Sequence, residues 1–167
     1  MNYHDIKKCD MLNGCGIRVS LWVAGCEHYC KYCQNQQTWD TNGGILFDET
    51  DEKELFDALK KDYISGITFT GGDPLHTNNL EDILNLVNKI HLLFPEKTIW
   101  LYTGYTWEEL MIDPKRKEIV SMCDVIVDGR YIDEKRDITL KWRGSSNQRV
   151  INVKQSITEG KIVLYEI

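Results

Sequence analysis

Three cysteines stand close together, with Cys26, Cys30 and Cys33 falling within eight residues. A structural zinc site needs four ligands, whereas three thiolates on one loop can hold three corners of a [4Fe-4S] cluster and leave one iron open to an exogenous ligand. An open iron implies that the cluster takes part in chemistry. The alternative is zinc, with His28, Cys9 or Cys15 as the fourth ligand. The spacing favours the cluster.

A second motif, Gly71-Gly72-Asp73-Pro74, follows a short run of β-branched and aromatic residues. Glycines allow other groups to approach the backbone closely, and a carboxylate can bind a cationic ligand. By itself the motif is also compatible with an ordinary strand-to-helix turn. Its meaning therefore depends on whether the chain brings it to the cysteines.

The elements that must position these motifs follow from hydrophobic periodicity. We predict strands over residues 17–23, 67–70, 98–102 and 124–127, and helices over about 51–63, 80–94 and from 106 onward. The first helix is expected to begin with a capping box formed by Asp51 and Glu54. Repeated βα units predict a mostly parallel sheet with its functional loops at the carboxyl ends of the strands. Both motifs would lie at that edge.

The chain has 167 residues, which is most simply one domain. A complete eight-stranded (β/α) barrel normally needs at least about 200 residues. The sequence therefore predicts an α/β fold whose sheet is a partial, open (β/α) barrel with mostly parallel strands. Residues 148–153 and 161–165 could add late strands or form an extended tail.

Charge and composition restrict the partners. The first 114 residues have nine basic and 18 acidic side chains, whereas residues 115–154 have ten basic and six acidic ones. A nucleic-acid surface is normally more strongly basic, so we expect a solvated face or a docking surface for an acidic protein partner. No apolar run approaches membrane-spanning length, and Met1–Asp10 precedes no apolar leader core. We expect a cytoplasmic protein with no nucleic-acid or membrane partner.

Two of these features together resemble a known superfamily. The Cys-x3-Cys-x2-Cys spacing, with Tyr32 before the last cysteine, and the Gly-Gly-acidic motif resemble those of the radical S-adenosylmethionine (SAM) enzymes. More narrowly, the chain resembles the activating proteins of anaerobic ribonucleoside-triphosphate reductase. Five segments support this resemblance: residues 13–20, 71–75, 102–105, 127–131 and 142–149. The most specific is Arg-Gly-Ser-Ser-Asn-Gln-Arg at 143–149.

The resemblance implies one radical SAM domain over residues 1–167, with a core of about 10–131 and a C-terminal extension over 132–167. Its [4Fe-4S] cluster would reduce SAM to methionine and a 5′-deoxyadenosyl radical, which would take a hydrogen atom from a glycine of the reductase. The implied partners are the glycyl radical subunit of that reductase and an unidentified one-electron donor. A basic contact through Lys141 and Arg143 is a further hypothesis.

The resemblance also implies residue roles. Cys26, Cys30 and Cys33 would be the catalytic metal ligands. In the SAM site, Tyr32 and Gln34 would lie near the adenine. Gly71 and Gly72 would approach the methionine moiety, and Asp73 would bind its ammonium. Thr103 and Asp128 would contact the ribose or the methionine, or would only complete a turn. Tyr32 could instead pack over the cysteine loop.

The remaining cysteines, Cys9, Cys15 and Cys123, are expected to have no catalytic role, with Cys123 in the core and His28 on the surface. Without the resemblance, residues 142–149 would be interpreted as a polar loop with one packed tryptophan.

Two further functions stay open. One is a radical SAM enzyme with another acceptor, either a pyruvate formate-lyase type activase or an enzyme of deazapurine synthesis. The other is a zinc-binding interaction module.

Overall fold

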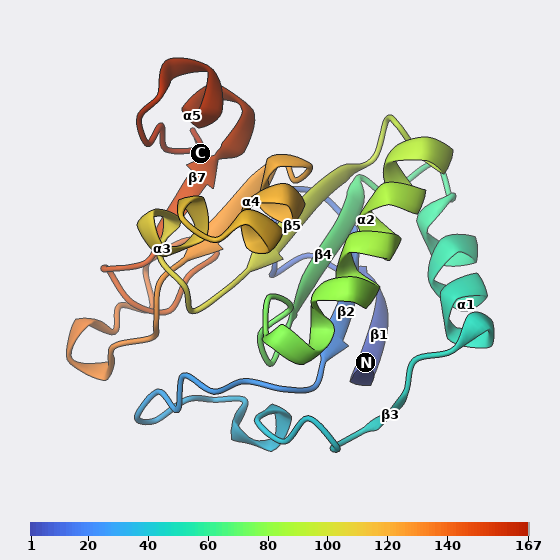
Figure 1. Cartoon of the computed structure of the whole chain (residues 1–167), viewed down its shortest axis with the longest axis horizontal. Helices are drawn as coiled ribbons and strands as arrows, with labels where there is room; N and C mark the ends of the chain where they lie inside the picture. The colour runs from blue at the N-terminus through green and yellow to red at the C-terminus, as the bar shows by residue number, and fades with distance from the viewer. Residues whose placement is uncertain (167) are drawn as a thin grey trace.

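One mixed sheet organises the fold. The computed structural model describes residues 1–166 and contains a seven-stranded sheet in the order β3-β1-β2-β4-β5-β6-β7 (Figure 1). Strands β2, β4, β5 and β6 are parallel, whereas β1, β3 and β7 pair antiparallel at the two sides. The strands are β1 (Asn2–Asp10), β2 (Arg18–Val23), β3 (Ile45–Leu46), β4 (Gly66–Gly71), β5 (Thr98–Tyr102), β6 (Val125–Asp128) and β7 (Arg149–Asn152).

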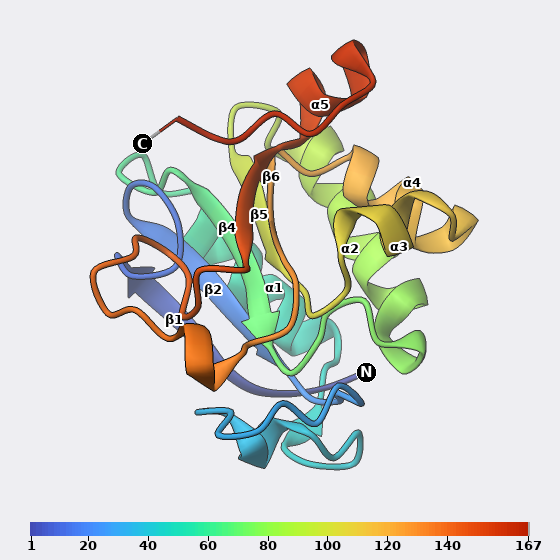
Figure 2. The same ribbon diagram turned by 90° about the vertical axis from the view of Figure 1, so that its left-hand side faces the viewer.

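Helices cover one face of this sheet. They are α1 (Glu49–Leu59), α2 (Leu80–Leu93), α3 (Trp107–Met111) and α4 (Pro114–Ser121), with α5 (Val153–Glu159) following β7 (Figure 1). Apolar side chains of β2, β4, β5 and β6 alternate, so that Ile67 and Phe69 enter the main core beneath the helices. Trp100, Val127 and Val150 form a second cluster with Trp142. Figure 2 shows residues 131–148 as the orange loop beside the sheet.

The central elements agree with the sequence predictions. Strand β5 covers the predicted residues, and β2, β4 and β6 differ from the predicted ranges by one residue at one or both ends. The predicted capping box was wrong, because Asp48 and Asp51 form the box and α1 ends at Leu59. Residues 148–153 include β7, but 161–165 form no strand and contribute only a bridge between Leu164 and Ile151.

Strand β1 was not predicted, because much of it is charged and exposed and its alternation is weak. Helices α4 and α5 were also missed, since α4 begins with the polar run Pro-Lys-Arg-Lys and α5 has only two buried residues. The prediction of a mostly parallel, unclosed α/β sheet is confirmed. Its antiparallel sides show a mixed sheet, so the finer description as a radical SAM barrel stays a proposal.

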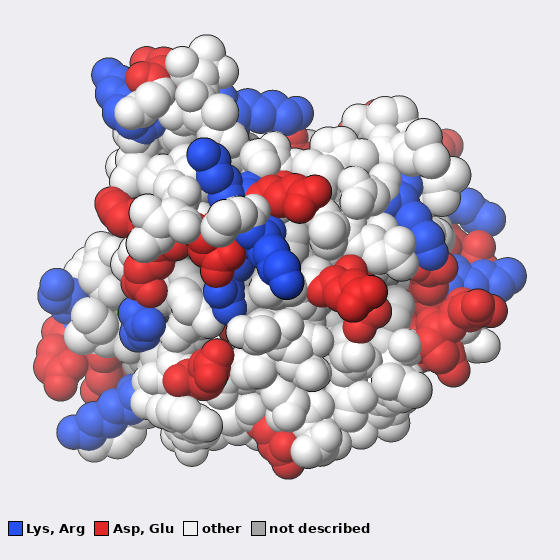
Figure 3. Space-filling model, in the orientation of Figure 1, with Lys and Arg blue, Asp and Glu red and all other residues white. Residues whose placement is uncertain are grey.

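The surface charges are interspersed. Figure 3 shows basic and acidic side chains side by side on the helical face. Four basic residues between 115 and 154 each pair with carboxylates, and these are Arg116, Arg130, Arg149 and Lys154. Pairing divides the basic stretch, which favours a solvated face over one continuous basic patch. Among residues 1–166, no helix is long and apolar enough to cross a membrane.

Candidate functional site

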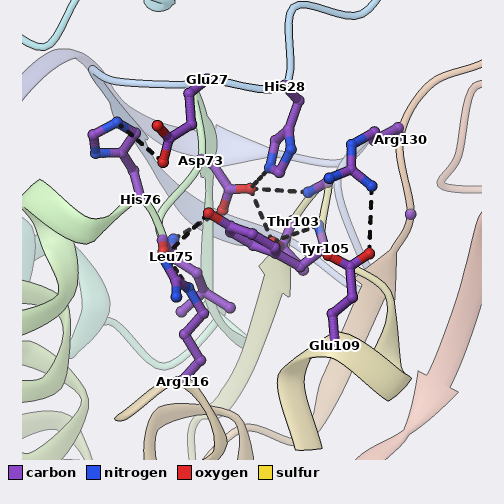
Figure 4. A network of polar contacts seen from close by, with 12 residues as sticks. Glu27, His28, Asp73, Leu75, His76, Thr103, Tyr105, Glu109, Arg116 and Arg130 are labelled. Atoms are coloured by element: carbon purple, nitrogen blue, oxygen red, sulfur yellow. Dashed lines mark hydrogen bonds and ion pairs between the residues drawn. The ribbon is translucent and has the colours of Figure 1, made fainter. Parts of the chain in front are cut away.

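The predicted motifs meet at the carboxyl edge of the parallel strands. The cysteine loop follows β2, Gly72 and Asp73 follow β4, and Thr103 and Gly104 follow β5. Figure 4 shows His28 from the cysteine loop, Asp73 and Thr103 pointing toward one another. The edge location was predicted from the repeated βα pattern and is confirmed.

The three thiols of the cysteine loop are half-buried and free. Burial raises the pKa of Cys26 to about 12, the backbone N–H of His28 opposes that rise, and nearby Cys30 and Cys33 add to it. Burial likewise raises the pKa of Cys30, against a backbone N–H from Tyr131. Protonated thiols are poor ligands, so loading depends on a metal that displaces their protons. Among residues 1–166, no three His, Cys, Asp or Glu groups converge in metal-holding geometry.

The donor set nevertheless fits three corners of a cluster. Asn35 donates its backbone N–H to Cys33, with the nitrogen 3.4 Å from Sγ. The backbone N–H groups of His28 and Tyr131 lower the pKa values of Cys26 and Cys30, against the effect of burial. Such hydrogen bonds stabilise thiolates and tune the potential of iron–sulfur centres. Tyr32 adopts a left-handed backbone with φ 60° and is 61% exposed, so it does not pack over the loop as the alternative reading held.

The glycine pair allows parts of the backbone to pack closely against one another. A Cβ on Gly72 would lie 2.5 Å from the carbonyl oxygen of Gly25, and one on Gly71 would lie 2.6 Å from the nitrogen of Val23. Gly71 also has a φ of 104°, which side-chain-bearing residues rarely adopt. The two glycines therefore let the end of β4 approach the base of the cysteine loop.

Asp73 is almost fully buried, and its carboxylate is occupied by donors of the chain. Oδ2 accepts hydrogen bonds from Thr103 Oγ1 and from Gly104 N, both at 2.9 Å, and it lies 2.6 Å from His28 Nε2. Oδ1 accepts the N–H of Leu75 at 2.8 Å. The expectation that His28 lies on the surface is wrong, because its side chain is only 4% exposed.

Thr103 and Asp128 also have partners within the chain. Thr103 Oγ1 accepts the N–H of Tyr105 besides donating to Asp73. The Asp128 carboxylate is buried, accepts two hydrogen bonds from the Arg149 guanidinium and one from the N–H of Trp107, and lies at the end of β6. These contacts satisfy turns and strand ends, which was the alternative reading of both residues.

A pocket of 240 Å³ lies beside the third cysteine. Its lining includes Cys33 and Gln34 from the cysteine loop, Tyr102 from β5, and Arg143 and Gln148 from the C-terminal extension. The Nε atom of this Arg143 side chain is buried, and no hydrogen-bond acceptor for it lies within residues 1–166. Buried donors of this kind favour a polar or anionic ligand.

The segment 142–149 is ordered by its own contacts. Gln148 accepts hydrogen bonds from the N–H groups of Gly144 and Ser145 and donates to the carbonyl of Gly129. Trp142 packs edge-to-face against Trp100 at 4.9 Å between ring centroids. The sequence reading of a polar loop with one packed tryptophan is thereby confirmed, and the loop is joined to the end of β6.

Comparison with known proteins agrees with the motifs. Residues 12–151 match the family described as a 4Fe-4S single cluster domain. The chain is 50% identical over 151 residues to the anaerobic ribonucleoside-triphosphate reductase-activating protein of Enterobacteria phage T4, covering 90% of this chain and 93% of that protein. The chain belongs to this family of activating proteins. The protein of the same name from Escherichia coli K12 is 41% identical over 156 residues, or 92% of this chain and 100% of the relative.

Membership in the family decides between the two metals considered for the cysteine loop. A 4Fe-4S cluster domain supports an iron–sulfur cofactor rather than zinc for this chain. Sequence reasoning missed the contribution of His28, Gly104, Tyr105 and Arg116 to this edge. Two signals could have suggested it: His28 stands between two of the cysteines, and Gly104 and Tyr105 lie in segment 102–105, which supports the family resemblance. Arg116 stands outside every motif.

Proposed function

We propose that this chain is an oxidoreductase of the radical SAM class that activates an anaerobic ribonucleoside-triphosphate reductase. The observation that supports it most directly is the convergence of a three-thiol loop and a Gly-Gly-Asp motif at one sheet edge, in a chain of the activating-protein family. When bound, the [4Fe-4S] cluster supplies one electron to SAM, which gives methionine and a 5′-deoxyadenosyl radical that takes a hydrogen atom from a glycine of the reductase.

Cys26, Cys30 and Cys33 hold the cluster as thiolates. The N–H of Asn35 donates to Cys33 Sγ, and the backbone N–H groups of His28 and Tyr131 favour the charged forms of Cys26 and Cys30. These groups partly offset the negative charge of the thiolates. All six cysteines of the chain are free thiols. Free thiols suit the reducing conditions of the cytoplasm, where we place the reaction.

The methionine moiety of SAM lies against Gly71 and Gly72 at the end of β4. Asp73 acts there mainly through its charge, because four donors of the chain already occupy its oxygens. A buried carboxylate attracts a nearby ammonium even without direct contact. Thr103 and Asp128 border the methionine or ribose from the ends of β5 and β6.

The adenosine end of SAM faces the pocket beside Cys33. Gln34 lines this pocket, Tyr32 stands exposed at its side of the loop, and the free Nε of Arg143 offers a buried donor. The open sheet leaves this edge accessible to a glycine-bearing segment of the reductase. A one-electron donor, whose identity is open, completes the set of partners.

Electron paramagnetic resonance tests this proposal. Anaerobically reconstituted chain, SAM, reductant and the reductase are expected to give a glycyl radical signal on the reductase. Cys26→Ala, Cys30→Ala and Cys33→Ala should each abolish SAM cleavage, whereas Cys9→Ala, at an exposed thiol outside the loop, should preserve it. Normal SAM cleavage without a glycyl radical would indicate another acceptor. Stoichiometric zinc without iron or sulfide would refute the cluster.

A further inference from the structure

We propose that His28 is a positioning residue, which ties the cysteine loop to the ends of β4 and β5 and thereby fixes the cluster ligands relative to the SAM site. This inference rests on the proposed function. His28 stands two residues after Cys26 and two before Cys30, so its side chain anchors the middle of the segment between the first two ligands. No ligand role for His28 is involved.

The anchor is a short, buried hydrogen bond. His28 Nε2 lies 2.6 Å from Asp73 Oδ2, and the two side chains are 4% and 2% exposed. A hydrogen bond to an ionised carboxylate is stronger than a neutral one, and shielding from water increases the cost of losing it. Asp73 is in turn fixed by Thr103 and Gly104, so the same carboxylate joins the cysteine loop to the ends of β4 and β5 (Figure 4).

The surroundings are shaped to accept this imidazole. A Cβ on Gly104 would lie 2.3 Å from His28 Cδ2, so only glycine leaves room for the ring. Tyr105 packs edge-to-face on the ring at 4.6 Å between centroids. Arg116 lies over Tyr105 at 4.4 Å and donates to the carbonyl of Leu75, which joins α4 to the same network (Figure 4).

Among residues 1–166, His28 provides the one side-chain hydrogen bond from the segment between the first two ligands, while Tyr29 packs edge-to-face on Trp39 at 5.2 Å between ring centroids. The first residue of the cysteine loop, Cys26, donates its N–H to Trp39, and Cys33 donates to Cys30 within the loop. Glu27 is exposed, and its contact with His76 spans 3.8 Å. The loop conformation includes a left-handed residue at Tyr29, with φ 50°, which a flexible loop would leave readily. His28 therefore restrains the segment where the ligands must be held.

Such a restraint matters because catalysis is sensitive to small displacements of the reacting groups. A misplacement of about 1 Å can cost on the order of 100-fold in rate. Without His28 the thiols can still bind metal, but the open iron is no longer held at a fixed distance from the end of β4. The expected defect is in SAM engagement rather than in cluster binding.

Three variants and one control test this inference. His28→Ala removes the donor, Gly104→Ala displaces the imidazole without removing it, and His28→Gln keeps an N–H near the position of Nε2. His4→Ala changes an exposed histidine outside the network and serves as the matched control. Thermal unfolding of each cluster-free chain verifies that the fold persists.

The first measurement uses the cluster-free chain. Hydrogen–deuterium exchange of the amides of residues 27–33 should accelerate on the order of 10- to 100-fold in His28→Ala and Gly104→Ala, the factor expected for loss of one charge-assisted hydrogen bond. Amides of α2 should be unchanged, and His28→Gln should restore much of the protection. Unchanged exchange in both defective variants would overturn the inference, whether or not the reductase is activated.

The second measurement uses reconstituted enzyme. His28→Ala should retain most of its iron but raise the KM for SAM on the order of 10-fold and weaken the change that SAM causes in the electron paramagnetic resonance spectrum of the reduced cluster. His28→Gln should recover both properties. A His28→Gln variant as defective as His28→Ala, or a KM equal to that of His4→Ala, would contradict the positioning role. If wild-type enzyme cleaves no SAM, the proposed function fails and the exchange experiment alone judges the anchor.

Discussion

Replacing Arg149 with alanine should destabilise the fold strongly, because it leaves a buried carboxylate without its main partner. Asp128 is 1% exposed and accepts hydrogen bonds from Arg149 at 2.6 and 3.1 Å. The same guanidinium binds Glu108 on α3, at 2.8 and 3.1 Å. The Arg149 side chain thus joins β7, β6 and α3, and burial of Asp128 determines the cost of its loss.

The magnitude follows from that burial. Removing one partner of a buried ion pair costs about 3–5 kcal/mol, and the lower end applies because the Arg149 side chain is 32% exposed. A domain of this size loses roughly 2–4 °C in Tm per kcal/mol. A loss of about 3 kcal/mol therefore predicts a fall of roughly 6–12 °C. Total stabilities of about 5–15 kcal/mol make this a large fraction.

Urea unfolding of the cluster-free chain, followed by circular dichroism, measures the effect. The matched control is Lys154→Ala, which removes the ion pair of a 70% exposed lysine with Asp124 and should cost about 0–1 kcal/mol. Adding Asp128→Asn to Arg149→Ala should recover about 1 kcal/mol or more, since the unpaired charge is then absent. Equal costs for Arg149→Ala and Lys154→Ala, or no recovery in the double variant, would refute the reasoning.

Three other predictions concern the cysteine loop, acid stability and the partner surface. Gly72→Ala should reduce iron incorporation, measured by iron analysis after reconstitution, because the new Cβ would lie 2.5 Å from a carbonyl oxygen at the base of the loop. Burial alone would raise the pKa of Asp10, but its hydrogen bonds lower it. The contribution of Asp10 to stability is therefore complete above its unfolded pKa near 4 and is lost as the pH falls further. Charge reversal at Lys141 and Arg143 should weaken reductase binding in titrations, most at low salt.

The first of these predictions has a matched control, and the other two have outcomes that would contradict them. For the first, Gly160→Ala adds a Cβ that meets no atom within 4 Å, although at a left-handed φ of 68°, so iron incorporation should be normal. Asp10→Asn should lower stability at pH 7 and flatten the fall in urea midpoint below about pH 4. An unchanged pH profile would contradict the role given to Asp10, and binding that is insensitive to both lysine and arginine reversal would contradict the basic contact.

The central strands and the location of the motifs were predictable from sequence because they depend on local pattern. Alternating or continuous apolar runs, such as residues 98–102, identify strands irrespective of their neighbours, and repeated βα units place the following loops at one edge. Strand β1 was not predictable in this way, because few of its residues are buried and its sequence shows little alternation. Its extended conformation is fixed by antiparallel pairing with β2.

Sequence by itself determined the donors: three thiols at cluster spacing on one loop, and a glycine pair with an aspartate at the end of a neighbouring strand. Only the tertiary structure decided what those groups contact. Asp73 accepts from His28, which is 45 residues away in the chain, and Asp128 accepts from Arg149 on an antiparallel strand. The partner of a buried carboxylate depends on which strand ends meet and which way a loop turns. The spacing of residues along the chain shows neither which strand ends meet nor which way a loop turns.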